Sequence, residues 1–145
     1  VGRAARDSKG NIIGYVLAPT LEAKYTIEAL QQAISHAGGG NLCGTIHHSD
    51  RGVQYCCDEY ITLLKEHHIR ISMTEDSNPT DNGMAERVNG IIKNEFLEPL
   101  QTPKNLLEAL PLVDHAVRTY NTLRPHLNLN MRTPAQVYEG KQIIL

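Results

Sequence analysis

The sequence predicts an α/β protein in which helices flank a mixed β-sheet. Short runs rich in β-branched residues alternate with longer segments whose apolar residues recur at helical spacing. Glycine, proline and asparagine separate these segments along the 145 residues. Hydrophobic residues make up 41% of the chain, which is enough for one folded domain with its own core.

The first fifty residues are expected to contain two strands and one helix. The opening "VGRAARDS" is a poor strand, because it has two arginines and little β-branching. A turn at Lys9-Gly10-Asn11 leads into a strand at 12–17, which Pro19 ends. Residues 20–40 keep helical spacing and finish in three glycines. The second strand, within 41–50, contains the apolar run 42–46 and should be buried.

The remaining residues continue the alternation. A short helix at 57–69 precedes a third strand at 69–74. The stretch "EDSNPTDNG" (75–83) consists of turn formers and predicts a mobile loop. Further helices are expected at 83–97, at 104–121 and within "TPAQVYEG".

The amino-acid composition excludes several classes of protein function. The net charge of −2 is not the basic footprint of a free-standing DNA-binding domain, so any DNA contact must be local or shared with other domains. Three cysteines, two of them adjacent, do not suggest a secreted disulfide framework and favour a reducing cytoplasm. Apolar runs stay well short of the roughly 20 residues of a membrane span. The chain begins without methionine and is expected to be a fragment.

Two motifs carry candidate chemistry. "HHSDRGVQY" (47–55) places Asp50 at the exit of the second strand. In "DNGMAERVNGIIKNEFL" (81–97), Glu86, Asn89 and Lys93 form one polar helical stripe, and Asp81 is positioned to cap the helix. The opposite, apolar stripe should face the core; it consists of Met84, Val88, Ile91 and Ile92. Taken separately, each signal is weak: such a polar stripe is typical of a solvated helix face, and a strand-end aspartate is typical of a turn.

Taken together, these motifs resemble insertion-sequence transposases with a retroviral-integrase-like core, within the ribonuclease-H-like superfamily. The resemblance also includes "DSKGNIIGYVLAPTLEA" and "YNTLRPHLNLNMRTPAQVY", so it covers nearly the whole chain after Asp7. It implies a ribonuclease-H-like mixed sheet and a single catalytic core domain over 1–145. It also implies that Asp50 and Glu86 are the second and third carboxylates of a DDE-type polynucleotidyl transferase, and that Lys93 contacts DNA.

The implied chemistry explains why carboxylates are needed. DNA cleavage and strand transfer are in-line displacements, which two Mg²⁺ ions about 3.5–4 Å apart can promote at both the attacking and the leaving oxygen. Mg²⁺ or Mn²⁺ takes oxygen ligands, so Asp50 and Glu86 are the expected metal ligands. Lys93 would contact a phosphate and position the DNA without reading its sequence. The implied partners are element ends, target DNA and further copies of the chain, in the bacterial cytoplasm and not in a membrane.

The resemblance fails at the N-terminus. The family's first carboxylate lies on a strand upstream of the segment that "DSKGNIIGY" resembles, and that first strand has no counterpart here. Asp7 matches a later turn aspartate, although it could act as a substitute ligand. The chain is therefore expected to be N-terminally truncated or degraded, and the isolated chain to be inactive or weak in DNA nicking. The alternative function is a catalytically dead remnant that only binds DNA or dimerises.

Other candidate sites have simpler explanations. His47-His48 and Cys56-Cys57 are adjacent pairs and lack the spacing of a structural zinc site. His48 could lie near the metals or be a hydrogen-bonded strand-end histidine. Arg124 could bind DNA or an acidic side chain, whereas Tyr120 and Asn121 favour a structural role. The "RPH…TP…Y" tail disfavours a simple ribonuclease H.

Overall fold

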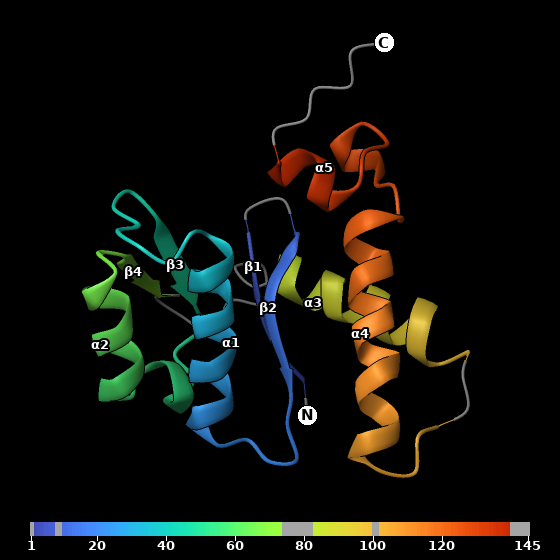
Figure 1. The fold of residues 1–145 in the computed structure, drawn as a ribbon, viewed down its shortest axis with the longest axis horizontal. Helices are drawn as coiled ribbons and strands as arrows, with labels where there is room; N and C mark the ends of the chain where they lie inside the picture. The colour runs from blue at the N-terminus through green and yellow to red at the C-terminus, as the bar shows by residue number, and fades with distance from the viewer. Residues whose placement is uncertain (1, 8–9, 74–82, 100–101, 140–145) are drawn as a thin grey trace. The chain divides into compact units, whose positions relative to one another are not determined.

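The computed structural model describes residues 2–7, 10–73, 83–99 and 102–139 (Figure 1). Most of the predicted 75–83 loop, together with the proposed cap Asp81, lies outside these residues. The described chain forms two compact units, one made of Val1–Ala5 with Ile13–Gly83 and the other of Arg6–Ile12 with Met84–Leu145. The expectation that 1–145 acts as one core domain stays a prediction.

The α/β class is confirmed, with both parallel and antiparallel strand pairing. Strands β1 (Gly2–Arg6) and β2 (Ile12–Leu17) form one pair, which must be antiparallel because the five residues between them are too few for a crossover. Strands β3 (Ile46–Ser49) and β4 (Arg70–Met73) pair in parallel, with Ile46 opposite Arg70 and Ser49 opposite Met73. The crossover between them contains the 3₁₀ turn η1 (Val53–Tyr55) and helix α2 (Asp58–Glu66).

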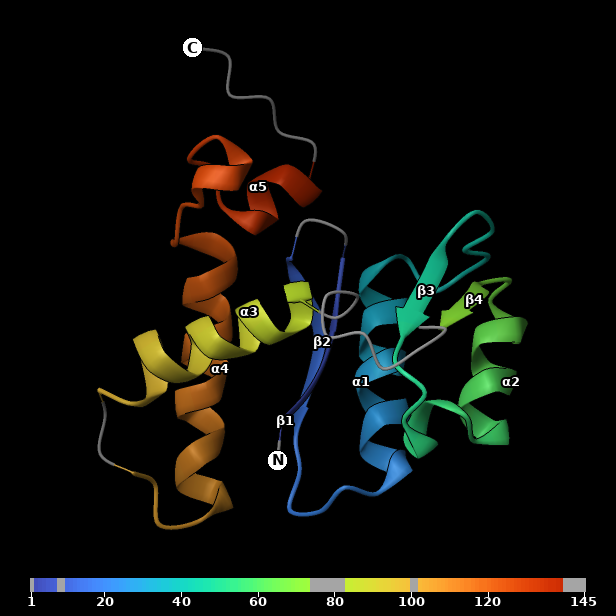
Figure 2. The same cartoon turned by 180° about the vertical axis from the view of Figure 1, so that it is seen from behind.

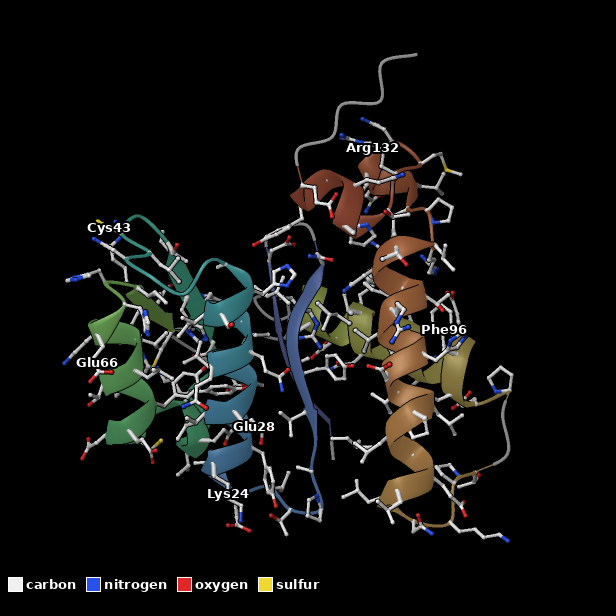
Figure 3. All side chains as sticks on the ribbon, in the orientation of Figure 1. Lys24, Glu28, Cys43, Glu66, Phe96 and Arg132 are labelled. Carbon is white, nitrogen blue, oxygen red and sulfur yellow. The ribbon has the colours of Figure 1, made fainter. Side chains whose placement is uncertain are left out.

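Helix α1 (Ala23–His36) builds the core of the first unit. Both views show it between the β1–β2 hairpin and the β3–β4 pair with α2 (Figures 1 and 2). The buried cluster agrees with the predicted helical spacing and consists of Ile27, Leu30, Ile34, Tyr60, Leu64 and Ile69. Charged side chains such as Lys24 and Glu28 on α1 and Glu66 on α2 are exposed (Figure 3).

The prediction that the opening residues make a poor strand is wrong, because Gly2–Arg6 form β1. Strand propensity is weak where pairing with a neighbour decides the conformation, and β2 supplies that neighbour directly after the turn. Two small residues, Ala4 and Ala5, are accommodated in the strand despite their low β propensity.

The second strand lies within the predicted range 41–50, but it is shorter than expected, and the prediction that it is buried is wrong. The apolar run 42–45 forms a turn, in which Gly44 has a φ of +92° and the Thr45 N–H donates to the Leu42 carbonyl over 3.0 Å. The strand begins only at Ile46, and this side chain is 57% exposed. Burial alternates along β3, with His47 and Ser49 on the covered side, so this is a half-buried strand.

The second unit is mainly helical. Helix α3 (Gly83–Ile91) continues into the π-helical segment η3 (Ile92–Leu97), where the sequence predicted one α-helix throughout. Helix α4 (Leu106–Thr122) packs against η3 and against α5 (Pro134–Tyr138), and a 3₁₀ turn, η4 (Leu127–Leu129), lies between the last two helices. No helix in the described residues is both long and apolar enough to span a membrane.

Capping side chains fix the starts of the last two helices. Asn105 Oδ1 accepts the Glu108 N–H over 2.9 Å at the start of α4. Thr133 begins α5 with a reciprocal capping box, in which its hydroxyl accepts from the Gln136 N–H and Gln136 Oε1 accepts from the Thr133 N–H.

Candidate active site

Asp50 directly follows β3, as the sequence predicted, and its carboxylate is exposed. One carboxylate oxygen, Oδ1, accepts the Gly52 N–H over 2.8 Å and so closes a short Asx turn. A Cβ at position 52 would lie 2.5 Å from Gln54 Nε2 and 2.9 Å from that oxygen, so a larger residue there would displace the Gln54 and Asp50 side chains. The other oxygen, Oδ2, has no partner in the described part of the chain, so it is available to a ligand.

A partly buried cluster of three rings, His47, Tyr55 and Tyr60, holds the two sides of the Asp50 loop together. His47 on β3 and Tyr60 on α2 share a hydrogen bond of 2.8 Å between His47 Nε2 and the Tyr60 hydroxyl. The Tyr55 ring, from η1, packs edge-on against Tyr60 with 5.5 Å between ring centroids. The loop that carries Asp50 is therefore anchored on both sides by residues of the same "HHSDRGVQY" motif.

The sequence offered only a weak signal for this cluster. His47 lies two residues before the buried Ser49, so the two occupy the same face of the strand.

Burial lowers the pKa of His47 and raises that of Tyr60. Protonated His47 carries an N–H on both ring nitrogens, so Nδ1 would then hold an N–H while buried without a hydrogen-bond partner in the described residues.

The cluster predicts a pH-dependent stability of the first unit. Because folding lowers the pKa of His47 below its ordinary 6.5, the unfolded chain binds more protons near that pH. The resulting stabilisation is complete above pH 6.5 and is lost as the pH falls through the lowered value. In urea titrations followed by circular dichroism, His47→Gln should show a smaller decrease in unfolding free energy between pH 7.5 and 5 than wild type.

The exposed Gln31 on α1 offers a control. Gln31→Ala changes no titratable group and should retain the wild-type dependence on pH. An equally steep loss of stability in His47→Gln would show that protonation of His47 does not limit the stability of the fold.

Glu86 lies in the first turn of α3 and is exposed, with no partner in the described residues. Asn89, one turn later, accepts a hydrogen bond from the Arg6 guanidinium. Val88 is 2% exposed, which confirms the predicted apolar face at that position, while Ile91 and Ile92 are half-buried and the Met84 side chain lies outside the described atoms. The predicted polar stripe is therefore on the surface.

Lys93 ends the stripe at the start of η3, with its side chain 71% exposed. Its Nζ lies 3.9 Å from Glu98 Oε1, a loose ion pair on the protein surface. Such a partner is easily exchanged for a phosphate oxygen in solution. The lysine therefore remains a candidate DNA contact.

Asp7 lies in the turn before β2 and makes hydrogen bonds within it. Asp7 Oδ1 accepts the Asn11 N–H over 3.0 Å, and the Asp7 carbonyl accepts the Gly10 N–H over 3.1 Å. Gly10 has a φ of +85°, and a Cβ there would lie 3.3 Å from the Tyr120 hydroxyl. These contacts give Asp7 a structural role in the turn.

The structural role expected for Asn121 is confirmed. Its side-chain Oδ1 accepts the Ile12 N–H over 2.9 Å, and its Nδ2 donates to the Ile12 carbonyl over 2.8 Å. A single amide thus satisfies both backbone groups at the first residue of β2. Tyr120, 2% exposed, lies beneath the same turn.

Of the two alternatives for Arg124, the structure shows the acidic partner. Arg124 donates two hydrogen bonds to Glu95, from Nε over 2.7 Å and from Nη2 over 2.6 Å. Its Nη1 lies 3.2 Å from His126 Nδ1, which must accept because arginine can only donate. Burial and the neighbouring Arg124 charge lower the pKa of His126, so this ring is neutral in the cluster.

His48 is a hydrogen-bonded strand residue, the second of its two expected roles. Its Nδ1 lies 3.0 Å from the Ser72 hydroxyl, opposite it in the β3–β4 register. Among the described residues, no group of three or more histidine, cysteine, aspartate or glutamate side chains is arranged to hold a metal ion.

Comparison with known proteins places these residues in a family context. Two sequence profiles described as integrase core domain match residues 7–79 and 67–134. The chain is 32% identical over 127 residues to the transposase for insertion sequence element IS629 of Shigella sonnei, an alignment that covers 88% of this chain and 42% of that protein. The chain thus spans less than half of this curated relative.

Solved structures share the fold. A chain of the simian T-cell lymphotropic virus intasome in complex with PP2A regulatory subunit B56 gamma aligns with a TM-score of 0.74 at 21% identity, covering 95% of this chain and 47% of that one. The HTLV-2 integrase catalytic core domain in complex with magnesium aligns with a TM-score of 0.66 at 26% identity, covering 90% and 78%. With this ribonuclease-H-like fold, and with insertion-sequence transposases as relatives, the chain belongs to the integrase core domain family.

Proposed function

We propose that this chain is part of the catalytic core of an insertion-sequence transposase, a DDE-type polynucleotidyl transferase that cuts and joins DNA strands. One observation carries the proposal. In a chain of the integrase core family, the exposed carboxylates of Asp50 and Glu86 occupy the two predicted motif positions, and each has oxygen atoms that no described group engages. Exposed carboxylate oxygens without a protein partner are accessible to a metal ion, and the match of both positions to the motifs of this family favours a ligand role.

The available donor atoms fit Mg²⁺ or Mn²⁺. Both ions prefer oxygen ligands and retain several waters, so they need few protein ligands. We propose that Asp50 and Glu86 bind the same metal site, which when loaded would activate the attacking oxygen and stabilise the leaving one. The Gly52 N–H orients the Asp50 carboxylate by holding Oδ1, and Oδ2 is left to bind. The magnesium in the HTLV-2 integrase core supports the choice of ion.

The proposed partner is DNA, both element ends and target. Lys93 would contribute a phosphate contact beside Glu86 on the same helix. The trimeric and dimeric forms of the HTLV-2 core support a homo-oligomer, and bacterial relatives together with three free thiols support the bacterial cytoplasm as the site of action.

A metal-binding measurement tests the shared site. Mn²⁺ binding to the 145-residue chain, followed by electron paramagnetic resonance, should weaken by at least about tenfold in Asp50→Asn and in Glu86→Gln. If the two carboxylates hold one ion, the double variant should bind little more weakly than either single variant. Asp58→Asn, which changes another exposed aspartate, should bind like wild type. Independent, additive losses would overturn the shared site.

A nicking assay tests whether the 145-residue chain is active by itself, and Mn²⁺ binding distinguishes a metal-dependent core from an inert remnant. The 145-residue chain by itself should nick supercoiled plasmid weakly or not at all with Mg²⁺, because the proposal assigns only two metal-binding carboxylates within it, Asp50 and Glu86. Robust nicking that Asp50→Asn abolishes would overturn this expectation and make Asp7 or another acid the third ligand. Unchanged Mn²⁺ binding in both single variants, with DNA binding intact, would favour the remnant.

A further inference from the structure

The π-helical segment η3 is an unusual backbone that needs support. Its hydrogen bonds run from residue i+5 to residue i, and the Glu98 N–H donates to the Lys93 carbonyl over 2.8 Å. Such turns are rare and occur mostly as single interruptions of α-helices, often at functional sites. An isolated segment of this sequence would be expected to adopt the more favourable α-helical pairing. Contacts from outside the segment must therefore hold the π turn.

The Glu95–Arg124 pair supplies such a contact. Glu95 is the fourth residue of η3, and Arg124, 29 residues later, follows the end of α4. Two parallel hydrogen bonds fix both the distance and the orientation of the carboxylate. The Arg124 side chain is only 26% exposed, less than any other basic partner in the described ion pairs, and His126 contacts it on another side.

The π turn also determines the surroundings of Lys93. In an α-helix, residues five apart lie about 140° apart around the axis, so Lys93 and Glu98 would point in different directions. In η3 they are one hydrogen-bonded turn apart, and their charged groups approach to 3.9 Å. Phe96, between Glu95 and Leu97 in the same segment, is half-buried (Figure 3).

We propose that Glu95 and Arg124 are positioning residues for Lys93: their ion pair holds the π turn, and the π turn sets the direction in which Lys93 presents its ammonium group to a DNA phosphate. This inference rests on the proposed DNA contact of Lys93. In this proposal Arg124, the arginine of the "RPH" motif, shapes the surface that contacts DNA and does not contact DNA itself.

Charge reversal tests the pair. In Arg124→Gln and in Glu95→Gln, the Glu98 amide should exchange hydrogen up to about fivefold faster, the range expected for a well-formed surface ion pair. Affinity for a fluorescein-labelled DNA duplex should decrease, and the salt slope should become shallower by roughly one phosphate contact, as in Lys93→Ala. The doubly reversed chain, Glu95→Arg with Arg124→Glu, should restore slow exchange and DNA affinity.

A second ion pair on α4 provides the control. Arg118 and Asp114 lie 2.7 Å apart on the exposed face of that helix, so Arg118→Gln removes a comparable charge pair and should change neither readout. Unchanged Glu98 exchange in Arg124→Gln would overturn the proposal. So would a reversed pair that restores neither measurement, since Arg124 would then act by touching DNA.

Failure of the underlying DNA contact can be distinguished. If Lys93→Ala leaves affinity and salt slope unchanged, the proposed role of Lys93 is wrong and the positioning role falls with it. The Glu98 exchange rates would still show whether the ion pair holds the π turn. If the Glu98 amide exchanges faster in Arg124→Gln while Lys93→Ala leaves DNA affinity unchanged, the Glu95–Arg124 pair has a structural role only.

Discussion

Val88→Asp should prevent the second unit from folding. Val88 is 2% exposed on α3, and its Cγ2 would lie 3.7 Å from a Cβ built on Gly10. A carboxylate at this position would lose its water without gaining a partner, so it must either remain charged at high cost or be protonated. We expect a loss of more than about 4 kcal/mol, a large part of the roughly 5–15 kcal/mol that stabilises typical domains.

Urea titrations followed by circular dichroism measure this effect. Val88→Ala should cost about 1–2 kcal/mol, because it removes two buried methyl groups and adds no charge. Lys93→Ala, on the exposed stripe of the same helical region, should change the free energy of unfolding by less than about 0.5 kcal/mol. A Val88→Asp protein with the wild-type midpoint would contradict the assignment of this face of α3 to the core.

Gly14→Val should destabilise the first unit by about 3 kcal/mol or more. A Cβ built on Gly14 would lie 2.1 Å from the Ala29 carbonyl oxygen and 2.8 Å from the Ala33 backbone nitrogen. Both atoms belong to the backbone of α1, which cannot rotate away as a side chain could. Strand β2 or helix α1 would therefore have to shift, and the hydrogen bond from the Tyr15 N–H to Gln32 Oε1 would be strained.

The control for Gly14→Val is a substitution at a glycine with open space around it. A Cβ added at Gly40 would meet no atom within 4 Å, and the φ of this residue is not positive, so Gly40→Ala should be neutral or slightly stabilising. Gly14→Ala should already be destabilising, because the clash begins at Cβ. Melting temperatures should rise in the order Gly14→Val, Gly14→Ala, Gly40→Ala. A Gly14→Val protein as stable as wild type would show that β2 and α1 do not pack this closely.

The helix faces were predictable because they depend on local periodicity. The buried positions Ile27, Leu30 and Ile34 follow from helical spacing alone, and so do Val88 on one face of α3 and Glu86 on the other. The positions of Asp50 and Glu86, one after a strand and one at a helix start, were likewise readable from the motifs. The resemblance of these motifs to insertion-sequence transposases pointed to the two carboxylates as candidate metal ligands.

The strands were less predictable, because they depend on their neighbours. Residues 2–6 become a strand only by pairing with β2, and the apolar run 42–45 turns while the polar "IHHS" forms β3 opposite β4. Neither result follows from propensity, since a strand's hydrogen bonds are made with another strand and not within the segment itself.

The sequence by itself determined the fold class, the helix faces and the identity of the two candidate metal-binding carboxylates. Only the tertiary structure decided the polar contacts between elements: the His47–Tyr60 hydrogen bond between β3 and α2, the Asn121 amide on Ile12, and the Arg124–Glu95 pair at the π turn. The last two contacts join residues 109 and 29 positions apart. Local periodicity cannot specify such contacts, because each depends on where the folded chain places a polar group and on the need to satisfy it once water is excluded.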